Sequence, residues 1–345
     1  MNSVLPITAG SISGMTGLAI RPVYFLKMNG SAQPNLVVKG EAQHHLNISD
    51  EDALVSIKWG SKLMKNVNNP QVNTKIMSAT EVGVFKAAAA AAFALGSPQA
   101  LNAAQPYKWV KMPMVLGLSD AEIYDDSNNP SIKDIKANVP AFLSDAVWHD
   151  LGTVVAVDIF NGNSDRFDIS SGFWQNKGNV MFLAGGATSV IGLDTFDPNA
   201  QNQANLASKG GFDELKILTD KTKRDAFALK CTQSVGKELA RAATKAGLGR
   251  FVAKVPGLNN ATISFDPDAM KKLYEPYAPI FAQGIEDGAG ALRQYLQGKA
   301  QQYAPPRAWR TARPGQNARV AIGRGRHDGK RLPAGVQARM TYLGW

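Results

Sequence analysis

Strand-forming and helix-forming patterns occupy different parts of this 345-residue chain. The segment Val4–Lys39 is predicted to form strands, because it contains short β-branched and aromatic runs separated by the turn-rich stretch NGSAQP. Residues 211–302 show mostly helical spacing of their apolar positions, with breaks at 247–249 and 256–267. This order predicts an α+β protein in which two or three antiparallel strands come first and a mainly helical part follows.

The middle of the chain is predicted to alternate between helices and strands. The acidic stretch Ser49–Asp52 begins a helix that continues through ALVSIKWGSKLMKNV, since acids in a first turn complement the helix dipole. Strands are expected at Thr74–Phe85 and Trp109–Gly117, with an alanine-rich helix at Lys86–Leu95 between them. A tight turn at Ala184–Ala187 then joins two further strands, NVMFLA and TSVIGLDTF, into a hairpin.

Hydrophobic residues make up 44% of the chain, as expected of a globular protein. No apolar run approaches the roughly 18 residues of a membrane-spanning helix, and the first residues lack the pattern of a signal peptide. The single cysteine, Cys231, cannot form an internal disulfide, and its helical context predicts a buried thiol rather than a nucleophile. We therefore expect a soluble protein without a membrane span, either cytoplasmic or secreted into a target cell without a signal peptide.

Positive charge is concentrated at the end of the chain. From Arg307 onward there are nine basic residues and one acidic residue, which account for +8 of the formal net charge of +10. Residues 304–345 are also rich in proline and glycine, so we predict a mobile basic tail that is suited to an acidic surface. We do not expect a nucleic-acid partner, because the tail lacks the spaced aromatic residues of a base-stacking platform. The non-enzymatic alternative is a basic protein that binds nucleic acid or another partner through its tail.

Five polar residues stand at the ends of predicted elements. Lys39 ends one strand, and Asp165 and Arg166 follow the apolar run VVAVDIF. Asn179 begins and Asp194 ends the predicted hairpin, and the successive intervals from Asp165 are 14 and 15 positions. Taken singly, each residue is ordinary, because Asn and Asp are common in turns and strand-end lysines are mostly solvated. Together they supply what phosphoryl transfer from ATP requires: a lysine for phosphate oxygens, a carboxylate that orients the accepting hydroxyl, and oxygen ligands for Mg²⁺.

Two other kinds of site have no support in the sequence. No segment matches GxxxxGK[ST], which argues against a P-loop NTPase. The four histidines show neither HExxH nor another zinc-binding spacing, so we do not expect a zinc site.

The stretch VVAVDIFNGNSDRF…GNVMFL…VIGLDTF resembles the catalytic core of the atypical, phosphatidylinositol-kinase-like protein kinases, in particular the actin-fragmin kinase catalytic domain. The similarity covers Leu151–Phe196 and extends more weakly to the β-rich N-terminus that contains Lys39. It implies a bilobal protein-kinase-like fold: an antiparallel, ATP-binding N-lobe at residues 1–117, a mainly helical C-lobe at 118–303, and then the basic tail at 304–345.

The resemblance also implies a role for each of the five polar residues. Asp165 would be the catalytic base or would orient the accepting hydroxyl, and Arg166 would support the catalytic loop or the transferring phosphate. Asn179 and Asp194 would hold Mg²⁺, and Lys39 would contact the phosphates of ATP. The chain departs from the family pattern after Asp194, where Thr and Phe stand in place of Phe and Gly.

Two further assignments complete the predicted ATP site. A helix acid is expected to pair with Lys39, either Glu51 or Glu81, and Glu51 is preferred because its helix directly follows the lysine strand. Ser13 and Gly14, within the stretch SISGMTG, would belong to a loose glycine-rich loop over the phosphates.

The function that the resemblance implies is an ATP- and Mg²⁺-dependent kinase that transfers the γ-phosphate to a hydroxyl group, with Ser or Thr of a protein substrate as the expected acceptor. Related families phosphorylate lipids or small molecules, or transfer AMP, and the sequence does not distinguish between these alternatives. A bacterial effector that acts in a target cell is one setting that fits a chain without a signal peptide.

Overall fold

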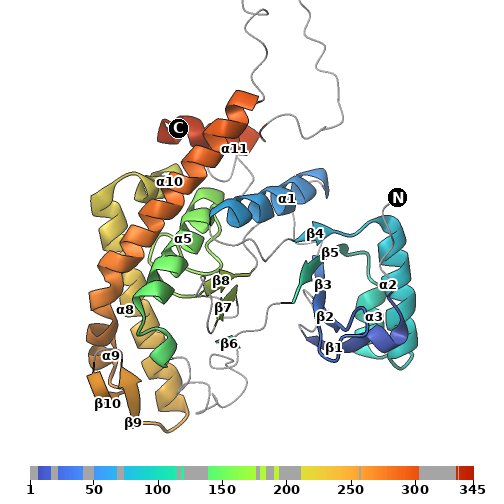
Figure 1. Cartoon of the computed structure of the whole chain (residues 1–345), viewed down its shortest axis with the longest axis horizontal. Coiled ribbons are helices and arrows are strands. Elements are labelled where there is room, and N and C mark those ends of the chain that lie inside the picture. The colour runs from blue at the N-terminus through green and yellow to red at the C-terminus, as the bar shows by residue number, and fades with distance from the viewer. Residues whose placement is uncertain are drawn as a thin grey trace, which may run out of the picture.

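The computed structural model describes residues 7–16, 22–41, 50–67, 74–114, 118–119, 139–175, 179–183, 190–193, 211–255, 258–302, 332 and 334–345. These parts form a mixed α+β structure, which confirms the fold class predicted from the sequence patterns (Figure 1). A five-stranded sheet with two helices forms one part, and the remaining described residues are mostly helical.

The N-terminal sheet is antiparallel and has the strand order β1-β2-β3-β5-β4. Its strands are β1 (Ile12–Thr16), β2 (Val23–Leu26), β3 (Leu36–Glu41), β4 (Lys75–Ile76) and β5 (Lys108–Pro113), and a 3₁₀ turn, η1 (Ala9–Ser11), precedes β1. The first three strands confirm the set predicted within Val4–Lys39. β5 confirms the first part of the strand predicted at Trp109–Gly117.

The strand predicted at Thr74–Phe85 is wrong beyond β4, because helix α2 (Ala79–Ala92) begins inside that stretch. Ser78 starts the helix through a capping box. Its hydroxyl accepts a hydrogen bond from the Glu81 backbone N–H, and the Glu81 carboxylate accepts one from the Ser78 N–H. This S-x-x-E pattern favours the start of a helix at Ser78, and it outweighs the strand-forming residues within Thr74–Phe85. A second helix of this part, α3 (Pro98–Ala104), follows.

A smaller sheet contains the predicted hairpin and has the order β6-β7-β8. Its strands are β6 (Leu118–Ser119), β7 (Val180–Phe182) and β8 (Val190–Gly192). Val180 pairs with Gly192 in antiparallel register, which confirms that the two sequence runs form one hairpin.

The two faces of the N-terminal sheet have different neighbours. Successive side chains on a strand point to opposite faces, and directly paired residues share a face. The face that packs against α2 and α3 carries large apolar side chains: Tyr24, Val38 and Trp109. The other face carries Val110 and Met112, which pack against Ile191 of β8. The sheet thus has α2 and α3 on one side and the β7–β8 hairpin on the other (Figure 1).

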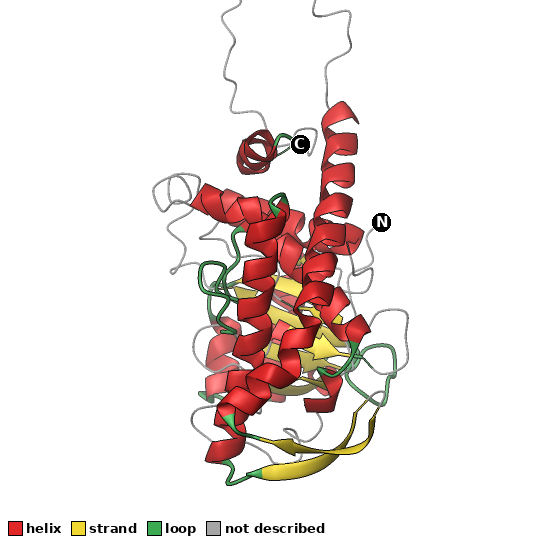
Figure 2. Ribbon diagram, turned by 90° about the vertical axis from the view of Figure 1, so that its left-hand side faces the viewer, coloured by secondary structure: helices red, strands yellow, loops and turns green. Residues whose placement is uncertain are grey.

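The helical part is arranged around a long apolar helix, α5, most of which is buried. Its helices are α1 (Asp50–Val67), α5 (Asp145–Asn161), α7 (Gly211–Leu215), α8 (Lys221–Lys245), α9 (Pro267–Tyr274) and α10 (Ala278–Gln302), with the 3₁₀ turns η4 (Lys216–Leu218) and η5 (Glu275–Tyr277) (Figure 2). α1 begins at Asp50, which confirms the helix expected after the acidic stretch. Among the described residues, no helix combines the length and apolar character that a membrane crossing requires.

A hairpin of β9 (Arg250–Val255) and β10 (Leu258–Ser264) interrupts the helices between α8 and α9. It lies at one end of the helical part (Figures 1 and 2). The sequence predicted only breaks between helices in this region, so the hairpin was missed.

The last stretch of the chain differs from the expected mobile tail. Helix α11 (Ala334–Leu343) packs against the helical core, where Leu332, Val336 and Met340 are buried. The spacing of Val336, Met340 and Leu343 is that of one helix face, a pattern obscured by the basic composition of the tail as a whole. Residues 303–331, which carry most of the tail's basic residues, lie outside the described residues.

Glycines allow α5 and α10 to approach closely. A Cβ atom on Gly284 would lie 2.1 Å from the carbonyl oxygen of His149, and one on Gly152 would lie 2.4 Å from that of Phe281. A larger side chain would therefore force the two helices apart. This contact fixes the position of α5, and with it the loop that follows α5.

We predict that Gly284→Ala lowers the free energy of unfolding by about 1–3 kcal/mol, because the new methyl group overlaps the α5 backbone. Gly290→Ala is the control in the same helix, since nothing lies within 4 Å of a Cβ atom there. Replacing that glycine should instead stabilise the helix by about 0.5–1 kcal/mol. Urea unfolding followed by tryptophan fluorescence measures both effects, and equal shifts for the two variants would contradict the close contact.

Candidate functional site

The loop that follows α5 is directed by the way the helix ends. α5 stops at Asn161, and Gly162 adopts the left-handed conformation, with φ 71°, that favours glycine. The N–H groups of Gly162 and Asn163 donate to carbonyl groups in the last turn of α5, at 3.1 and 2.8 Å, which is the pattern of a Schellman motif. The chain therefore leaves the helix in one direction and carries Asp165 and Arg166 to the β7–β8 hairpin.

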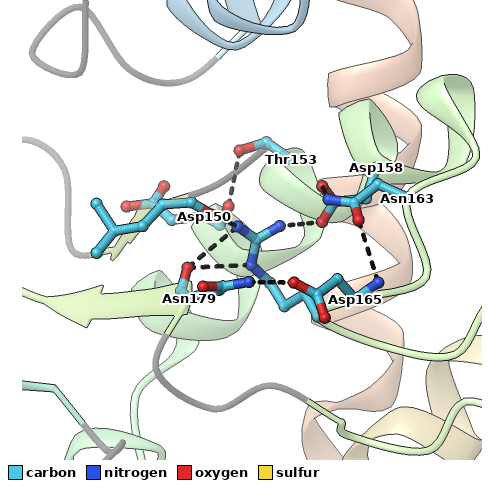
Figure 3. Close-up of polar contacts among 8 residues, drawn as sticks. Asp150, Thr153, Asp158, Asn163, Asp165 and Asn179 are labelled. Atoms are coloured by element: carbon cyan, nitrogen blue, oxygen red, sulfur yellow. Dashed lines mark hydrogen bonds and ion pairs between the residues drawn. The ribbon is translucent and has the colours of Figure 1, made fainter. Parts of the chain in front are cut away.

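A buried polar network, here named the Arg166 cluster, joins this loop to its surroundings (Figure 3). Its members are Asp158, Asn163, Asp165, Arg166 and Asn179. Arg166 has no solvent exposure and forms an ion pair with Asp158 of α5. Its guanidinium also donates to the carbonyl oxygens of Asn179, at 3.1 Å, and Leu193, at 2.5 Å. One side chain thus connects α5, the loop and the residues that border both hairpin strands.

The surroundings of Arg166 are closely packed. A Cβ atom on Gly192 of β8 would lie 3.0 Å from the guanidinium and 2.6 Å from Val154 of α5. Burial raises the pKa of Asp158, and the charge and hydrogen bond of Arg166 act against this shift, as does the hydrogen bond from Asn163. A buried charge without a partner of opposite charge is costly in free energy. The charges of Arg166 and Asp158 are therefore each stabilised by the other. Arg166 therefore joins the loop to α5 and to the borders of the hairpin strands.

Asp165 and Asn179 meet at the edge of the cluster. The amide nitrogen of Asn179 donates to Oδ2 of Asp165 at 2.8 Å, and the Asp165 backbone N–H donates to Oδ1 of Asn163 at 3.1 Å (Figure 3). Asn163 in turn donates to Asp158 at 3.0 Å. Asp165 is partly exposed, whereas Asn179 is buried. The structure therefore brings two predicted site residues into direct contact and leaves the carboxylate residue the more accessible of the two.

Asp194, the second predicted metal ligand, lies outside the described residues. The residue before it is held at both of its backbone groups. The N–H of Leu193 donates to the carbonyl of Asn179 at 2.8 Å, and its carbonyl accepts the hydrogen bond from Arg166. Leu193 is therefore fixed beside Asn179.

Lys39 lies on the face of the N-terminal sheet that is turned toward β8. It pairs with Val110 across β3 and β5, and Val110 packs against Ile191 of β8. Lys39 is only 5% exposed, and its Nζ lies 3.1 Å from the carboxylate of Glu41 in the same strand. Lys39 is therefore a buried cation on the hairpin side of the sheet. Sequence statistics favour a solvated lysine at a strand end, and Lys39 differs from that expectation.

Glu81, one of the two acids considered as a partner for Lys39, is placed elsewhere. It forms an ion pair with Lys111, which follows Val110 in β5 and so points to the opposite face, toward α2. Burial would raise the pKa of Glu81, but hydrogen bonds from Lys111 and Ser78 outweigh this effect and lower the pKa. The preferred partner, Glu51, lies in the first turn of α1, and its side chain is outside what the structure describes.

Ser13 and Gly14 occupy a strand rather than the loop that was expected. Both belong to β1, which pairs with β2 and contains an irregularity between Ile12 and Gly14. The Ser13 hydroxyl donates to the carbonyl oxygen of Phe25 at 3.0 Å. The stretch SISGMTG is therefore mostly strand, because its backbone groups find partners in β2. The connection between β1 and β2, residues 17–21, lies outside the described residues.

Two other reactive side chains among the described residues, Cys231 and His149, lie outside this site. Cys231 is fully buried, and burial raises the pKa of its thiol well above the usual value, which confirms the buried thiol expected from the sequence. His149 of α5 lies 2.9 Å from Asp287 of α10, a surface contact between two helices. In the part of the chain that the structure describes, no group of three or more His, Cys, Asp or Glu residues is arranged to hold a metal ion.

A groove of about 490 Å³ opens elsewhere, between α8 and α10. Its lining includes Arg224, Leu229 and Ala282, and it contains none of the predicted site residues. Its walls mix both charge signs with small apolar residues, so its chemistry does not indicate one ligand. The Arg166 cluster, with its convergent polar groups, is the stronger candidate for a functional site.

Two members of the cluster, Asp158 and Asn163, were not singled out by the sequence analysis. A signal for Asp158 was present, since it is the one charged residue in the apolar run VVAVDIF, and a charge in such a run needs a buried partner. Asn163 offered no comparable signal, because a polar residue after a helix-ending glycine is ordinary in a turn.

No protein-family model matches this chain, and comparisons with curated proteins and with solved structures likewise find no match. Function must therefore be inferred from the geometry of the Arg166 cluster and from the sequence motif that forms it.

We predict that Asp158→Leu lowers the free energy of unfolding by about 3–5 kcal/mol, because it leaves Arg166 buried without its counter-ion. Asp165→Ala, in the same cluster but partly exposed, should cost only about 1 kcal/mol through the lost hydrogen bond to Asn179. The double variant Asp158→Leu/Arg166→Met should recover part of the loss, since neither charge is then left alone. Guanidinium chloride unfolding compares the three, and similar costs for Asp158→Leu and Asp165→Ala would refute a buried ion pair at the centre of the site.

Proposed function

We propose that this protein is an ATP- and Mg²⁺-dependent kinase with a bilobal, protein-kinase-like fold that transfers the γ-phosphate to a Ser or Thr hydroxyl of a protein substrate. One observation carries the proposal. The Arg166 cluster holds a partly exposed carboxylate, Asp165, in contact with Asn179 at the start of a hairpin whose second strand leads to Asp194. Phosphoryl transfer from ATP needs a carboxylate that orients the accepting hydroxyl and oxygen ligands for Mg²⁺, and the contact between Asp165 and Asn179 supports these roles.

Asp165 is the residue that would orient the accepting hydroxyl. Phosphoryl transfer depends mainly on positioning and electrostatics, so a fixed carboxylate contributes more than a mobile one. Asp165 is fixed at its backbone by Asn163 and at its side chain by Asn179. Its partial exposure leaves it accessible to a substrate.

Asn179 and Asp194 would supply the protein ligands of Mg²⁺. The amide nitrogen of Asn179 is used by Asp165, which leaves the amide oxygen as the atom suited to Mg²⁺. Mg²⁺ in such sites takes one or two protein ligands and completes its octahedron with phosphate oxygens and water. A site of this kind does not require the cluster of three carboxylates or imidazoles that is absent from the described residues.

In this proposal the nucleotide would bind to the face of the N-terminal sheet around Lys39. Val23 pairs with Lys39, and Phe25 pairs with Val37, so all four side chains share the face turned toward the hairpin. Val23, Phe25 and Val37 are partly exposed apolar residues, which suits an adenine ring, and Lys39 supplies a cation for phosphates. In a bilobal enzyme the sheet with α2 and α3 would be the N-lobe, and the hairpin and helices would form the C-lobe.

We predict that the purified protein transfers label from γ-³²P-ATP with Mg²⁺ to itself or to a protein in a cell lysate, and that Asp165→Asn reduces the rate by about 100-fold or more. The reduction follows from the loss of the charge that orients the acceptor. Asp168→Asn, three residues further along the chain, is the control, because the Asp168 carboxylate accepts hydrogen bonds from Ser170 and Ser171. Transfer that survives in Asp165→Asn would remove this residue from the reaction.

Two lysines in adjacent strands allow a second, matched test. Lys39→Met should raise the KM for ATP or abolish transfer, whereas Lys111→Met, on the opposite face of the sheet, should leave the KM for ATP unchanged. Initial rates at varied ATP concentrations measure the difference, and equal effects would place the nucleotide elsewhere.

The label also separates the alternative reactions. Transfer from α-labelled but not γ-labelled ATP would identify an AMP-transferase, and label in a lipid or small-molecule fraction would change the acceptor class. No transfer from either nucleotide, with or without lysate, would favour a basic binding protein without catalytic activity.

A further inference from the structure

Helix α11 brings the end of the chain back to the end of α5. Val336 and Met340 are buried in the same apolar core as α5, and the C-terminal Trp345 stacks on Phe160 in the last turn of α5. The two rings are 5.7 Å apart and nearly parallel, with an angle of 2° between their planes. A second contact lies on α7, where the Tyr342 hydroxyl donates to Asp213 at 3.3 Å.

Arg339 is the polar residue at this contact. It is only 1% exposed, and its guanidinium donates to the carbonyl oxygen of Asn161 at 3.2 Å. The same guanidinium lies 6.0 Å from the ring centre of Phe160. Burial lowers the pKa of Arg339 to about 10, so the side chain is still charged at neutral pH.

The position of this contact along α5 is informative. Asn161 is the last residue of α5, and the carbonyl groups at a helix end lack donors from the following turn and carry partial negative charge. A buried guanidinium is costly, and an apolar side chain would fill the same space at lower cost. Arg339 is therefore explained better as a donor to the helix end than as packing alone. Gly162 and the loop that presents Asp165 follow directly.

We propose that Arg339 and Trp345 are positioning residues for the loop that carries Asp165. They touch neither Asp165 nor any reacting atom among the described contacts. They hold the last turn of α5, from which the loop takes its direction. The effect on catalysis rests on the kinase function proposed above, whereas the mechanical link between α11 and the loop does not.

The first test measures the loop without any assay of activity. Hydrogen–deuterium exchange of the full-length protein, with mass spectrometry of peptides that cover residues 161–167, is compared for wild type, Arg339→Met and Gln337→Met. Gln337 lies on the exposed side of the same helix and is the matched control. Arg339→Met is expected to speed exchange in the loop about tenfold or more, with unchanged exchange in α2 and in the β9–β10 hairpin. Unchanged loop exchange, or a uniform increase over the whole protein, would overturn the proposal.

The second test uses the kinetics of phosphate transfer. Arg339→Met and Trp345→Ala are expected to lower kcat by about tenfold to 100-fold and to leave the KM for ATP unchanged, because a displaced loop affects the reacting geometry and the nucleotide surface is on the sheet. Arg339→Lys, which keeps the charge but loses the planar donor group, should restore only part of kcat. A rise in the KM for ATP with unchanged kcat would contradict a positioning role.

The two tests separate the two proposals. Faster loop exchange in Arg339→Met, in a protein whose wild type transfers no phosphate, would support the link between α11 and the loop and refute the kinase function. Normal phosphate transfer by the wild type, with unchanged loop exchange and unchanged kcat in Arg339→Met, would support the kinase function. It would refute the link between α11 and the loop.

Discussion

The ion pair between Arg166 and Asp158 is the interaction on which the arrangement of the site depends. Both side chains are buried, so each charge is tolerated only because the other is present and because further hydrogen bonds satisfy the guanidinium. Those further bonds go to Asn179 and Leu193, at the borders of the β7–β8 hairpin. The pair therefore sets the position of the hairpin relative to α5, and the close contact of α5 with α10 sets the position of the pair.

The ion pair and its hydrogen bonds give the loop after α5 a rigid support. Asn163 holds the backbone of Asp165, and Asn179 holds its carboxylate. The Asp165 side chain would therefore lose little conformational freedom on binding a substrate. The hairpin also contacts the N-terminal sheet through Ile191 and Val110, on the face that carries Lys39. Elements from both halves of the chain thus meet at one apolar contact.

Much of the fold could be predicted from the sequence, because strong local patterns mark many of its strands and helices. The first strands, the helix at Asp50 and the β7–β8 hairpin followed from residue type and turn signals. The errors arose where one local signal competed with another, as at Ser78, or where composition concealed a short helical face, as in α11. Contacts such as Arg166 with Asp158, or Arg339 with Asn161, join residues through the tertiary fold, and no spacing rule in a single sequence specifies them.

In the proposed site, the Arg166 cluster presents Asn179 to a metal ion that is bound with ATP. Electron paramagnetic resonance of Mn²⁺, used in place of Mg²⁺, measures this directly by counting protein-bound Mn²⁺ with and without ATP. We expect ATP-dependent binding in the wild type and a loss of about tenfold or more in affinity for Asn179→Ala. We expect no change for Asn66→Ala on α1, whose amide donates to the carbonyl oxygen of Lys62 in the same helix. Mn²⁺ binding that is absent from the wild type, or that is the same in Asn179→Ala, would contradict the account.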